Sequence, residues 1–218
     1  MKRKLKLPKV NYQYQRNRKA MNIENLDTNP FKQFILWMNQ AVKCKVPEPT
    51  AMSLATIGSN NKISNRMILL KSIENDSFIF YTNLTSRKAK DLKKNKSVAA
   101  VFWWPQIGKQ VRIEGHVKNI GEKHADNYFS TRSRNSQISS WASDQSSVLK
   151  DRKTLLKKFR IIEKRFENKD IKRPSFWSGY EIKPFLIEFW QSRENRLHDR
   201  IVYKRITQKK WRKYRLNP

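Results

Sequence analysis

The chain is poor in residues that restrict or loosen a backbone. Its 218 residues include one cysteine, Cys44, with five glycines and eight prolines. A single cysteine excludes an intrachain disulfide and fits a reducing compartment. The low glycine and proline content argues against a low-complexity chain. Cys44 falls in a helical pattern, so we expect it to be inert packing and not a nucleophile.

Long apolar segments are also missing. No run approaches the roughly 20 residues that a membrane span requires. The N-terminus carries basic residues but no apolar segment of a secretory signal. We therefore expect a cytoplasmic protein with no membrane partner.

Signatures of metal sites and phosphate-binding loops are absent as well. The three histidines form no set with cysteine or carboxylates at a recognised ligand spacing. Gly108 and Gly115 are too isolated for a Rossmann or P-loop fingerprint. The sequence therefore predicts no metal.

Acidic residues are scarce: 18 stand against 48 lysines and arginines, for a net charge of +30. This charge suits a nucleic-acid-binding protein, or an enzyme that acts on small phosphates. The basic residues are spread over the whole chain, and we find no zinc-finger, basic-zipper or ribonucleoprotein signature. A basic nucleic-acid-binding protein remains the alternative, on charge alone, and we expect no specific nucleic-acid partner.

What is present favours one packed domain. The chain contains 7 Trp, 7 Tyr and 11 Phe, which supports a globule with a substantial core. Residues 1–28 are polar and predict a flexible basic arm, and residues 29–218 predict a single domain. Helices are expected at 29–43, 86–95, 122–132, 136–142 and 148–168. Strands are expected at 50–57, 65–72, 77–82, 97–104, 109–119, 185–190, 200–206 and 211–215.

The order of these elements predicts the fold class. The strands are short and show no repeated strand–helix–strand alternation. We therefore expect an α+β fold, mainly antiparallel, with a barrel decorated by helices. The strands at 65–72 and 77–82 are predicted to form a hairpin around residues 74–76.

Two segments could bind an anion. Arg66–Lys71 is a strand with a cation at each end, which could lie along a ligand or be a core strand with charged ends. In the second segment a strand ends and a helix begins near Thr85 or Ser86. Free amide groups and the helix dipole favour an anion there, and Arg87 and Lys88 add full charges. An ordinary capped surface helix is the alternative.

Tyr128, Arg132 and Ser136 recur at a spacing of four. They would share one helical face if the helix continues to Ser136, and could hold a ring and a phosphate. The alternative is a solvated face with Tyr128 packed inward. Gln110 and the pair Gln145–Ser146 are unremarkable by themselves.

The segment from Trp190 to Arg200 is the most informative. If residues 197–200 are extended, then Arg196, His198 and Arg200 share one face. Three such groups would repel one another unless an anion lay opposite, and Trp190 offers a flat apolar surface. His198 is expected to be neutral and bonded to a ligand. A structural histidine paired with Asp199 is the alternative.

Taken in order, these segments resemble the pyridoxine (pyridoxamine) 5′-phosphate oxidase family over residues 29–218. The motifs that carry the resemblance are Arg66–Lys71, Phe80–Asn83, Ser86–Ala89, Tyr128–Ile138, Gln145–Ser147, Pro174–Trp177, Glu188–Arg200 and Arg215–Pro218.

The resemblance implies a Greek-key-like, FMN-binding split β-barrel with a C-terminal dimerisation region. It implies a homodimer with FMN at the subunit interface. The cofactor residues that it implies are Arg66, Met67, Ile68, Leu69, Lys71, Tyr81, Thr82, Arg87, Lys88, Gln110, Gln145, Ser146, Trp190 and Arg200. The substrate residues that it implies are Lys71, Tyr128, Arg132, Ser136, Arg196, Leu197 and His198.

The implied reaction belongs to vitamin B6 biosynthesis and salvage. Pyridoxine or pyridoxamine 5′-phosphate would lose a hydride from C4′ to N5 of FMN, giving pyridoxal 5′-phosphate. Dioxygen would accept the electrons and yield hydrogen peroxide. Arg196 is the first candidate for a catalytic residue and His198 the second.

The chain departs from the family pattern in three places. Ser192 and Ser178 stand where glycine is frequent, which concerns loop geometry more than chemistry. The arm carries Asn11-x-x-Tyr14 where the family often has Arg-x-x-Tyr, so the sequence does not predict a lid over the substrate.

Overall fold

The computed structural model describes residues 19–208 and 210–218. The helices are α1 (Pro30–Lys43), α2 (Arg87–Lys94), α3 (Glu122–Ser130), α4 (Arg134–Ala142) and α5 (Arg152–Arg165). The strands are β1 (Ala51–Ile57), β2 (Ile63–Leu69), β3 (Ser72–Glu74), β4 (Ser77–Asn83), β5 (Ser97–Trp104), β6 (Lys109–Asn119), β7 (Trp177–Gln191), β8 (Asp199–Arg205) and β9 (Trp211–Leu216). Three 3₁₀ turns are η1 (Ser59–Asn61), η2 (Pro105–Ile107) and η3 (Glu194–Arg196).

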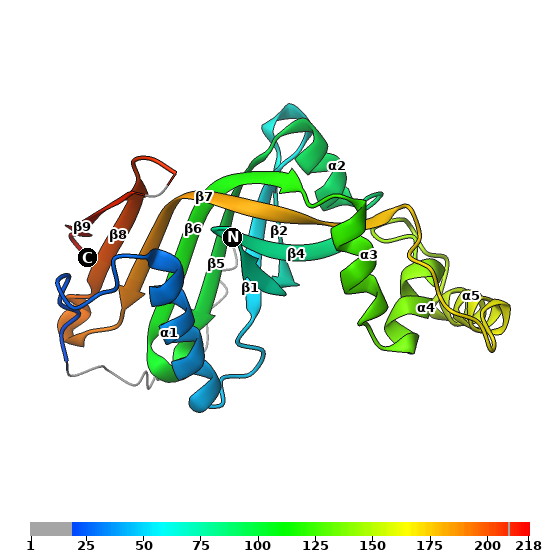
Figure 1. The fold of residues 1–218 in the computed structure, drawn as a ribbon, viewed down its shortest axis with the longest axis horizontal. Coiled ribbons are helices and arrows are strands. Elements are labelled where there is room, and N and C mark those ends of the chain that lie inside the picture. Colours follow the sequence, from blue (N-terminus) through cyan, green and yellow to red (C-terminus); the bar gives the residue numbers. More distant parts are fainter. Residues whose placement is uncertain (1–18, 209) are drawn as a thin grey trace, which may run out of the picture.

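The strands form one antiparallel sheet that curls into a half-barrel (Figure 1). Its order is β2-β1-β5-β6-β7-β4-β3, and β8 and β9 extend it from β7. The long strand β7 organises the sheet, because its first part pairs with β4 and its last part with β8. The predicted α+β class with a mainly antiparallel barrel is confirmed.

Helix α1 covers one face of the sheet. Asn29 caps it by accepting from the amide of Phe31 at 2.8 Å, and Pro30 occupies its first turn. Phe34 packs edge-on against Phe78 and Phe102, with ring centroids 5.1 Å and 4.9 Å away. Cys44 follows the helix and is exposed, so the expectation that it packs inside was wrong.

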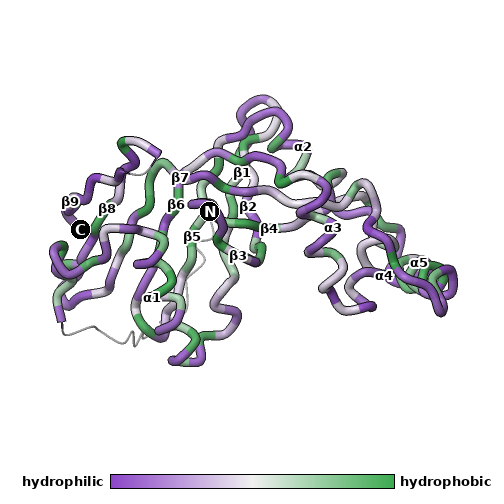
Figure 2. The backbone as a smooth tube through the Cα atoms, viewed as in Figure 1, coloured by the Kyte–Doolittle hydropathy of each residue, from purple (hydrophilic) through white to green (hydrophobic). Residues whose placement is uncertain are grey.

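The remaining elements lie at opposite ends of the sheet. Figure 1 shows α3, α4 and α5 at one end and the β8–β9 hairpin at the other. Hydrophobic residues alternate with hydrophilic ones along the strands in Figure 2, as expected where one face packs on a core. None of the helices within the described ranges is long and apolar enough to cross a membrane.

The predicted strand at 65–72 is two strands. β2 pairs with β1 from Ile57↔Ile63 to Ala51↔Leu69, so the predicted hairpin with 77–82 was wrong in its partner. The chain then changes its partner strand. The amide of Leu70 donates to the carbonyl oxygen of Thr50, just before β1, whereas the amide of Lys71 donates to that of Ile79 in β4. Only the short β3 forms a hairpin with β4. The apolar run Met67–Leu70 leads into this change of partner with no glycine or proline to mark a turn, so the sequence pattern did not show it.

The predicted strand at 185–190 is the second half of β7. Its first half contains Gly179 and Pro184, which normally argue against a central strand. The sheet accommodates Pro184 at a register shift between Glu114 and Gly115 of β6. A Cβ on Gly115 would lie 2.5 Å from the carbonyl oxygen of Lys183, so only glycine permits this approach.

The predicted arm is described only from residue 19. Asn11 and Tyr14 lie outside the described residues. Met21 is buried, and its amide donates to Asp199 at 3.0 Å while its carbonyl accepts from Arg215. These bonds join the last part of the predicted arm to β8 and β9.

Candidate active site

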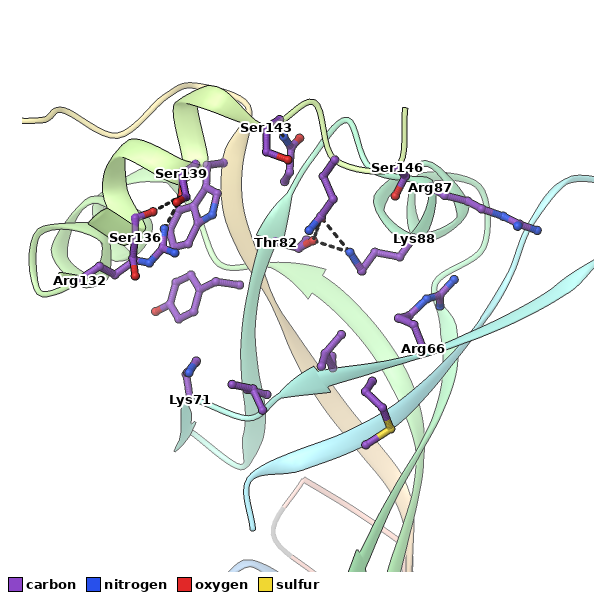
Figure 3. Close-up of a pocket in the computed structure, with 18 of the residues that line it drawn as sticks. Arg66, Lys71, Thr82, Arg87, Lys88, Arg132, Ser136, Ser139, Ser143 and Ser146 are labelled. Atoms are coloured by element: carbon purple, nitrogen blue, oxygen red, sulfur yellow. Dashed lines mark hydrogen bonds between the residues drawn. The ribbon is translucent and has the colours of Figure 1, made fainter. Parts of the chain in front are cut away.

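An open cavity of about 940 Å³ lies beside β2 and β4, under α2, α3 and α4 (Figure 3). Many of the predicted site residues line it. They are Arg66, Met67, Ile68, Leu69, Lys71, Tyr81, Thr82, Arg87, Lys88, Tyr128, Arg132, Ser136, Gln145 and Ser146.

Three cations gather at one end of this cavity, which we call the α2 end: Arg66, Arg87 and Lys88. Ser86 caps α2 by accepting from the amide of Ala89, which directs the first turn of the helix to the same place. Three cations and a helix start at the same end make it suited to a phosphate.

Lys88 is held from several sides. Its Nζ donates to Thr82 Oγ1 and to Gln145 Oε1, both at 2.9 Å. Burial lowers the pKa of Lys88 to about 8, and the charge of Arg66 lowers it further. The bond to Gln145 also ties the loop after α4 to the α2 end.

The opposite end of the cavity, which we call the α4 end, contains Lys71, Arg132 and Ser136 (Figure 3). The guanidinium of Arg132 lies 4.7 Å from the ring centroid of Trp177 and donates to Ser140. Burial lowers the pKa of Arg132, and Tyr128 opposes this change.

The predicted single helical face for Tyr128, Arg132 and Ser136 was wrong. α3 ends at Ser130 and α4 begins at Arg134, so Arg132 lies in the connection between them. The turn between the helices nevertheless brings all three side chains to one cavity.

A stack of aromatic rings from β4, α3 and β7 lines the cavity beside Arg132. The rings of Tyr81 and Tyr128 lie 3.8 Å apart at 11°, and Trp177 is parallel to Tyr81 at 5.3 Å. Burial raises the pKa of Tyr81 to about 12, with a smaller contribution from Glu74. The stack therefore fixes the side chains of Tyr81, which the resemblance assigns to FMN, and of Tyr128, which it assigns to the substrate.

The remaining predicted residues form a second cluster, which we call the β8 group: Gln110, Trp190, Arg196, Leu197, His198 and Arg200. Strand register creates it, because Gln110 pairs with Trp190 and Trp190 pairs with Arg200. The ring of His198 lies 4.6 Å from that of Trp190. Arg200 donates to Glu188 at 2.7 Å, which raises its pKa.

The predicted extended run through residues 197–200 was wrong. Arg196 ends a 3₁₀ turn with φ of 60°, and β8 begins only at Asp199. Strand alternation therefore does not place Arg196, His198 and Arg200 on one face.

His198 is held as a neutral ring. Its Nδ1 lies 3.1 Å from the amide of Arg193, which has to be the donor, so Nδ1 carries no proton. Partial burial lowers the pKa of His198, and the charge of Arg196 lowers it further. Asp199 instead accepts from Arg215 at 2.7 Å, so the alternative of a His198–Asp199 pair is not observed.

The two groups do not meet within one chain. The described lining of the cavity contains no member of the β8 group. The cavity has phosphate-binding character, and the β8 group has the predicted catalytic residues.

Sequence reasoning missed several lining residues. Serine recurs every three or four residues through 133–146, a helical spacing that could have indicated a polar wall. Trp177 was noted only as part of a motif, with no role. The missed residues are Ser64, Asn83, Ser133, Ser139, Ser140, Ser143 and Trp177.

The half-barrel and its cavity define an FMN-binding split barrel. An FMN-binding protein from Nostoc punctiforme has this fold, with a TM-score of 0.69 over 88% of this chain and 100% of that chain at 15% identity. PhzG from Burkholderia lata, solved with tetrahydrophenazine-1-carboxylic acid, matches with a TM-score of 0.84 and 31% identity, over 89% of this chain and 95% of that chain.

The family follows from the sequence matches. Residues 38–166 match the family model "Pyridoxamine 5′-phosphate oxidase", and residues 177–218 match "Pyridoxine 5′-phosphate oxidase C-terminal dimerisation region". The chain belongs to the pyridoxine/pyridoxamine 5′-phosphate oxidase family, and it is an FMN-dependent oxidoreductase.

Curated relatives carry the family name. The protein of Acaryochloris marina is 46% identical over 193 residues, covering 88% of each chain. That of Vesicomyosocius okutanii is 47% identical over 199 residues, covering 91% of this chain and 93% of the relative. The dimerisation-region match supports a homodimer.

Proposed function

We propose that the protein oxidises pyridoxine 5′-phosphate and pyridoxamine 5′-phosphate to pyridoxal 5′-phosphate. When bound, FMN would accept the hydride from C4′ at N5 and pass two electrons to dioxygen, giving hydrogen peroxide. With the amine substrate, water would hydrolyse the resulting imine to the aldehyde and release ammonia. The residues of this chain bind and orient the two molecules.

The observation that carries the proposal is the arrangement of cations at two ends of one cavity. A cofactor and a substrate that each bear a phosphate need two anion sites separated by room for two rings. The α2 end offers Arg66, Arg87 and Lys88, and the α4 end offers Lys71 and Arg132. We assign the α2 end to the FMN phosphate and the α4 end to the substrate phosphate.

The donors at the α2 end fit a flavin phosphate. Lys88 is buried and its pKa of about 8 leaves it mostly charged at neutral pH, and Arg87 is exposed at the first turn of α2. Thr82, Gln145 and Ser146 add polar atoms around them. Met67 and Leu69 belong to β2, which would lie along the flavin.

A second copy of the chain would complete the site. The β8 group falls in the dimerisation region except for Gln110, and lies apart from the cavity of its own chain. Met67 of the cavity and Leu197 of the β8 group are 64% and 67% exposed, so both offer apolar surface to a second chain. We propose that FMN binds at the interface, between the cavity of one protomer and the β8 group of its partner.

Arg196 and His198 would then orient the substrate ring. Arg196 is exposed on a tight turn and brings a fixed charge to the C4′ side. His198 has Nδ1 committed as an acceptor, so Nε2 carries the proton and can donate to the ring substituents. Their contribution is proximity and charge placement.

The test is an absorbance spectrum of the purified protein, followed by anaerobic addition of pyridoxamine 5′-phosphate. We expect a flavin spectrum that bleaches, and much slower bleaching with pyridoxamine, which lacks the phosphate. Bleaching by a tricyclic carboxylic acid of the kind bound to PhzG, with none by pyridoxamine 5′-phosphate, would overturn the proposal.

A further inference from the structure

A buried carboxylate lies directly behind the α2 end. Asp91 is on α2, three residues after Lys88, and its exposure is 8%. Residues three apart lie on one helix face, so Asp91 is directed toward the same region as Lys88. Carboxylates are seldom buried without a partner, and no role has yet been given to this one.

Asp91 is connected to Arg66 through a hydroxyl. Thr56 Oγ1 donates to Asp91 Oδ2 at 2.8 Å and accepts from Arg66 NH1 at 2.7 Å. Arg66 NH2 lies 3.8 Å from the same carboxylate oxygen. Thr56 is completely buried in β1, so it cannot turn toward water.

Strands β1 and β2 hold two further guanidinium hydrogens. NH1 also donates to the carbonyl oxygen of Leu54 at 3.1 Å, and NH2 donates to Ser64 Oγ at 2.8 Å. An arginine fixed at this many points presents one edge to the cavity in a single orientation.

Gly58 makes room for this carboxylate. A Cβ at Gly58 would lie 2.7 Å from Asp91 Oδ1. The φ of Gly58 is −91°, which any residue adopts, so the contact and not the backbone requires glycine here. The β1–β2 turn therefore lies against Oδ1 of Asp91, while Thr56 bonds to Oδ2.

We propose that Asp91 is a positioning residue which, through Thr56, orients the Arg66 guanidinium toward the phosphate of FMN and so gives the protein its preference for FMN over riboflavin. This inference rests on the assignment of the α2 end to the FMN phosphate.

The charge of Asp91 is compatible with an anion site. A bare carboxylate would repel a phosphate, but this one is compensated by Arg66 at 3.8 Å. Burial lowers the pKa of Arg66, and Asp91 opposes that change. The carboxylate thus offsets part of the repulsion between Arg66 and Arg87.

The test measures affinities of the apoprotein for FMN and for riboflavin, by quenching of flavin fluorescence. Loss of a hydrogen bond to a charged group corresponds to about a tenfold change in affinity. We therefore expect Asp91→Asn to weaken FMN binding about tenfold and to leave riboflavin binding unchanged. Asp151→Asn is the matched control, because Asp151 caps the distant helix α5 and asparagine caps equally well.

Gly58→Ala is the second variant, since it displaces the carboxylate without changing any charge. We expect the same selective loss of FMN affinity. If Asp91→Asn does not fold, the result for Gly58→Ala alone tests the positioning role of Asp91. In an Arg66→Ala background, Asp91→Asn should leave the FMN-to-riboflavin ratio unchanged, because the residue it positions is gone.

Equal losses for both flavins would show a merely structural role and overturn the inference. Tighter FMN binding by Asp91→Asn would show that repulsion dominates, and would also overturn it. If the wild-type protein binds FMN no more tightly than riboflavin, the assignment of the α2 end fails instead.

Discussion

The cavity and the β8 group differ in how their functional side chains are held. In the cavity, Lys88 makes two bonds of 2.9 Å and Tyr81 stacks on Tyr128 at 3.8 Å. In the β8 group, Arg196 follows Asn195 through a turn in which both residues have positive φ, 60° and 52°. Leu197, next to them, is 67% exposed.

The difference separates two tasks. A binding region that one chain packs internally is ordered before its ligand arrives, which reduces the entropic cost of binding. An exposed turn with strained residues keeps its geometry only when other groups surround it. We therefore infer that phosphate binding belongs to one protomer and that orientation of the reacting ring depends on two.

The largest effect should come from Arg196→Ala. Removal of a fixed charge that acts in the transition state typically costs about 100- to 1000-fold in kcat. We expect that loss in steady-state oxygen uptake, with FMN affinity unchanged, because we assign Arg196 to the substrate ring and not to the cofactor. Equal losses of turnover and FMN binding would place Arg196 at the cofactor and remove the contrast between the regions.

Arg132→Ala should act on substrate binding instead. Truncation of a charged partner of a phosphate costs about 2 kcal/mol, or about 30-fold. We expect KM for pyridoxamine 5′-phosphate to rise by that factor with a small change in kcat. Arg160→Ala, on the exposed part of α5, is the control. A change in kcat alone would contradict the assignment of the α4 end.

The smallest effect should be the pH dependence of FMN binding. The pKa of Lys88 is lowered to about 8, chiefly by burial, and a bound phosphate would raise it. Affinity should therefore be nearly constant well below pH 8, where the ammonium is present, and fall as the pH rises through 8, by at most about tenfold per pH unit. The cofactor phosphate is already ionised above about pH 6.

Lys88→Met provides the check on that pH dependence. It should bind FMN more weakly and with no fall above pH 8. Lys109 also has a pKa lowered to about 8 by burial, but it lies over Trp37 outside the cavity. A fall that persists in Lys88→Met would indicate another group.

The fold was largely predictable because strong local patterns agree with it. The Asn29–Pro30 start of α1 and the alternation in β6 both appear in the structure. The first half of β7 could not be predicted, because Pro184 is tolerated only at a register shift that involves a distant strand. Tertiary pairing, and not local preference, decides such a segment.

The site was less predictable from residue types. A shared helical face for Arg132 and Ser136 depended on a helix that continues to Ser136. The chain instead breaks between α3 and α4, and this break brings both side chains to the cavity. Trp177 shows its role only through Tyr81 and Arg132, which are distant in sequence. The net charge of +30 has no structural explanation.

The most direct test of the two-chain account is complementation between two impaired variants. Arg132→Ala damages the cavity and Arg196→Ala damages the β8 group. A mixed dimer would contain one site with both changes and one site with neither. After unfolding and refolding an equal mixture, we expect about one quarter of wild-type activity at low substrate concentration. Activity no higher than the average of the two separate variants would contradict the account, since it would place the complete site within one chain.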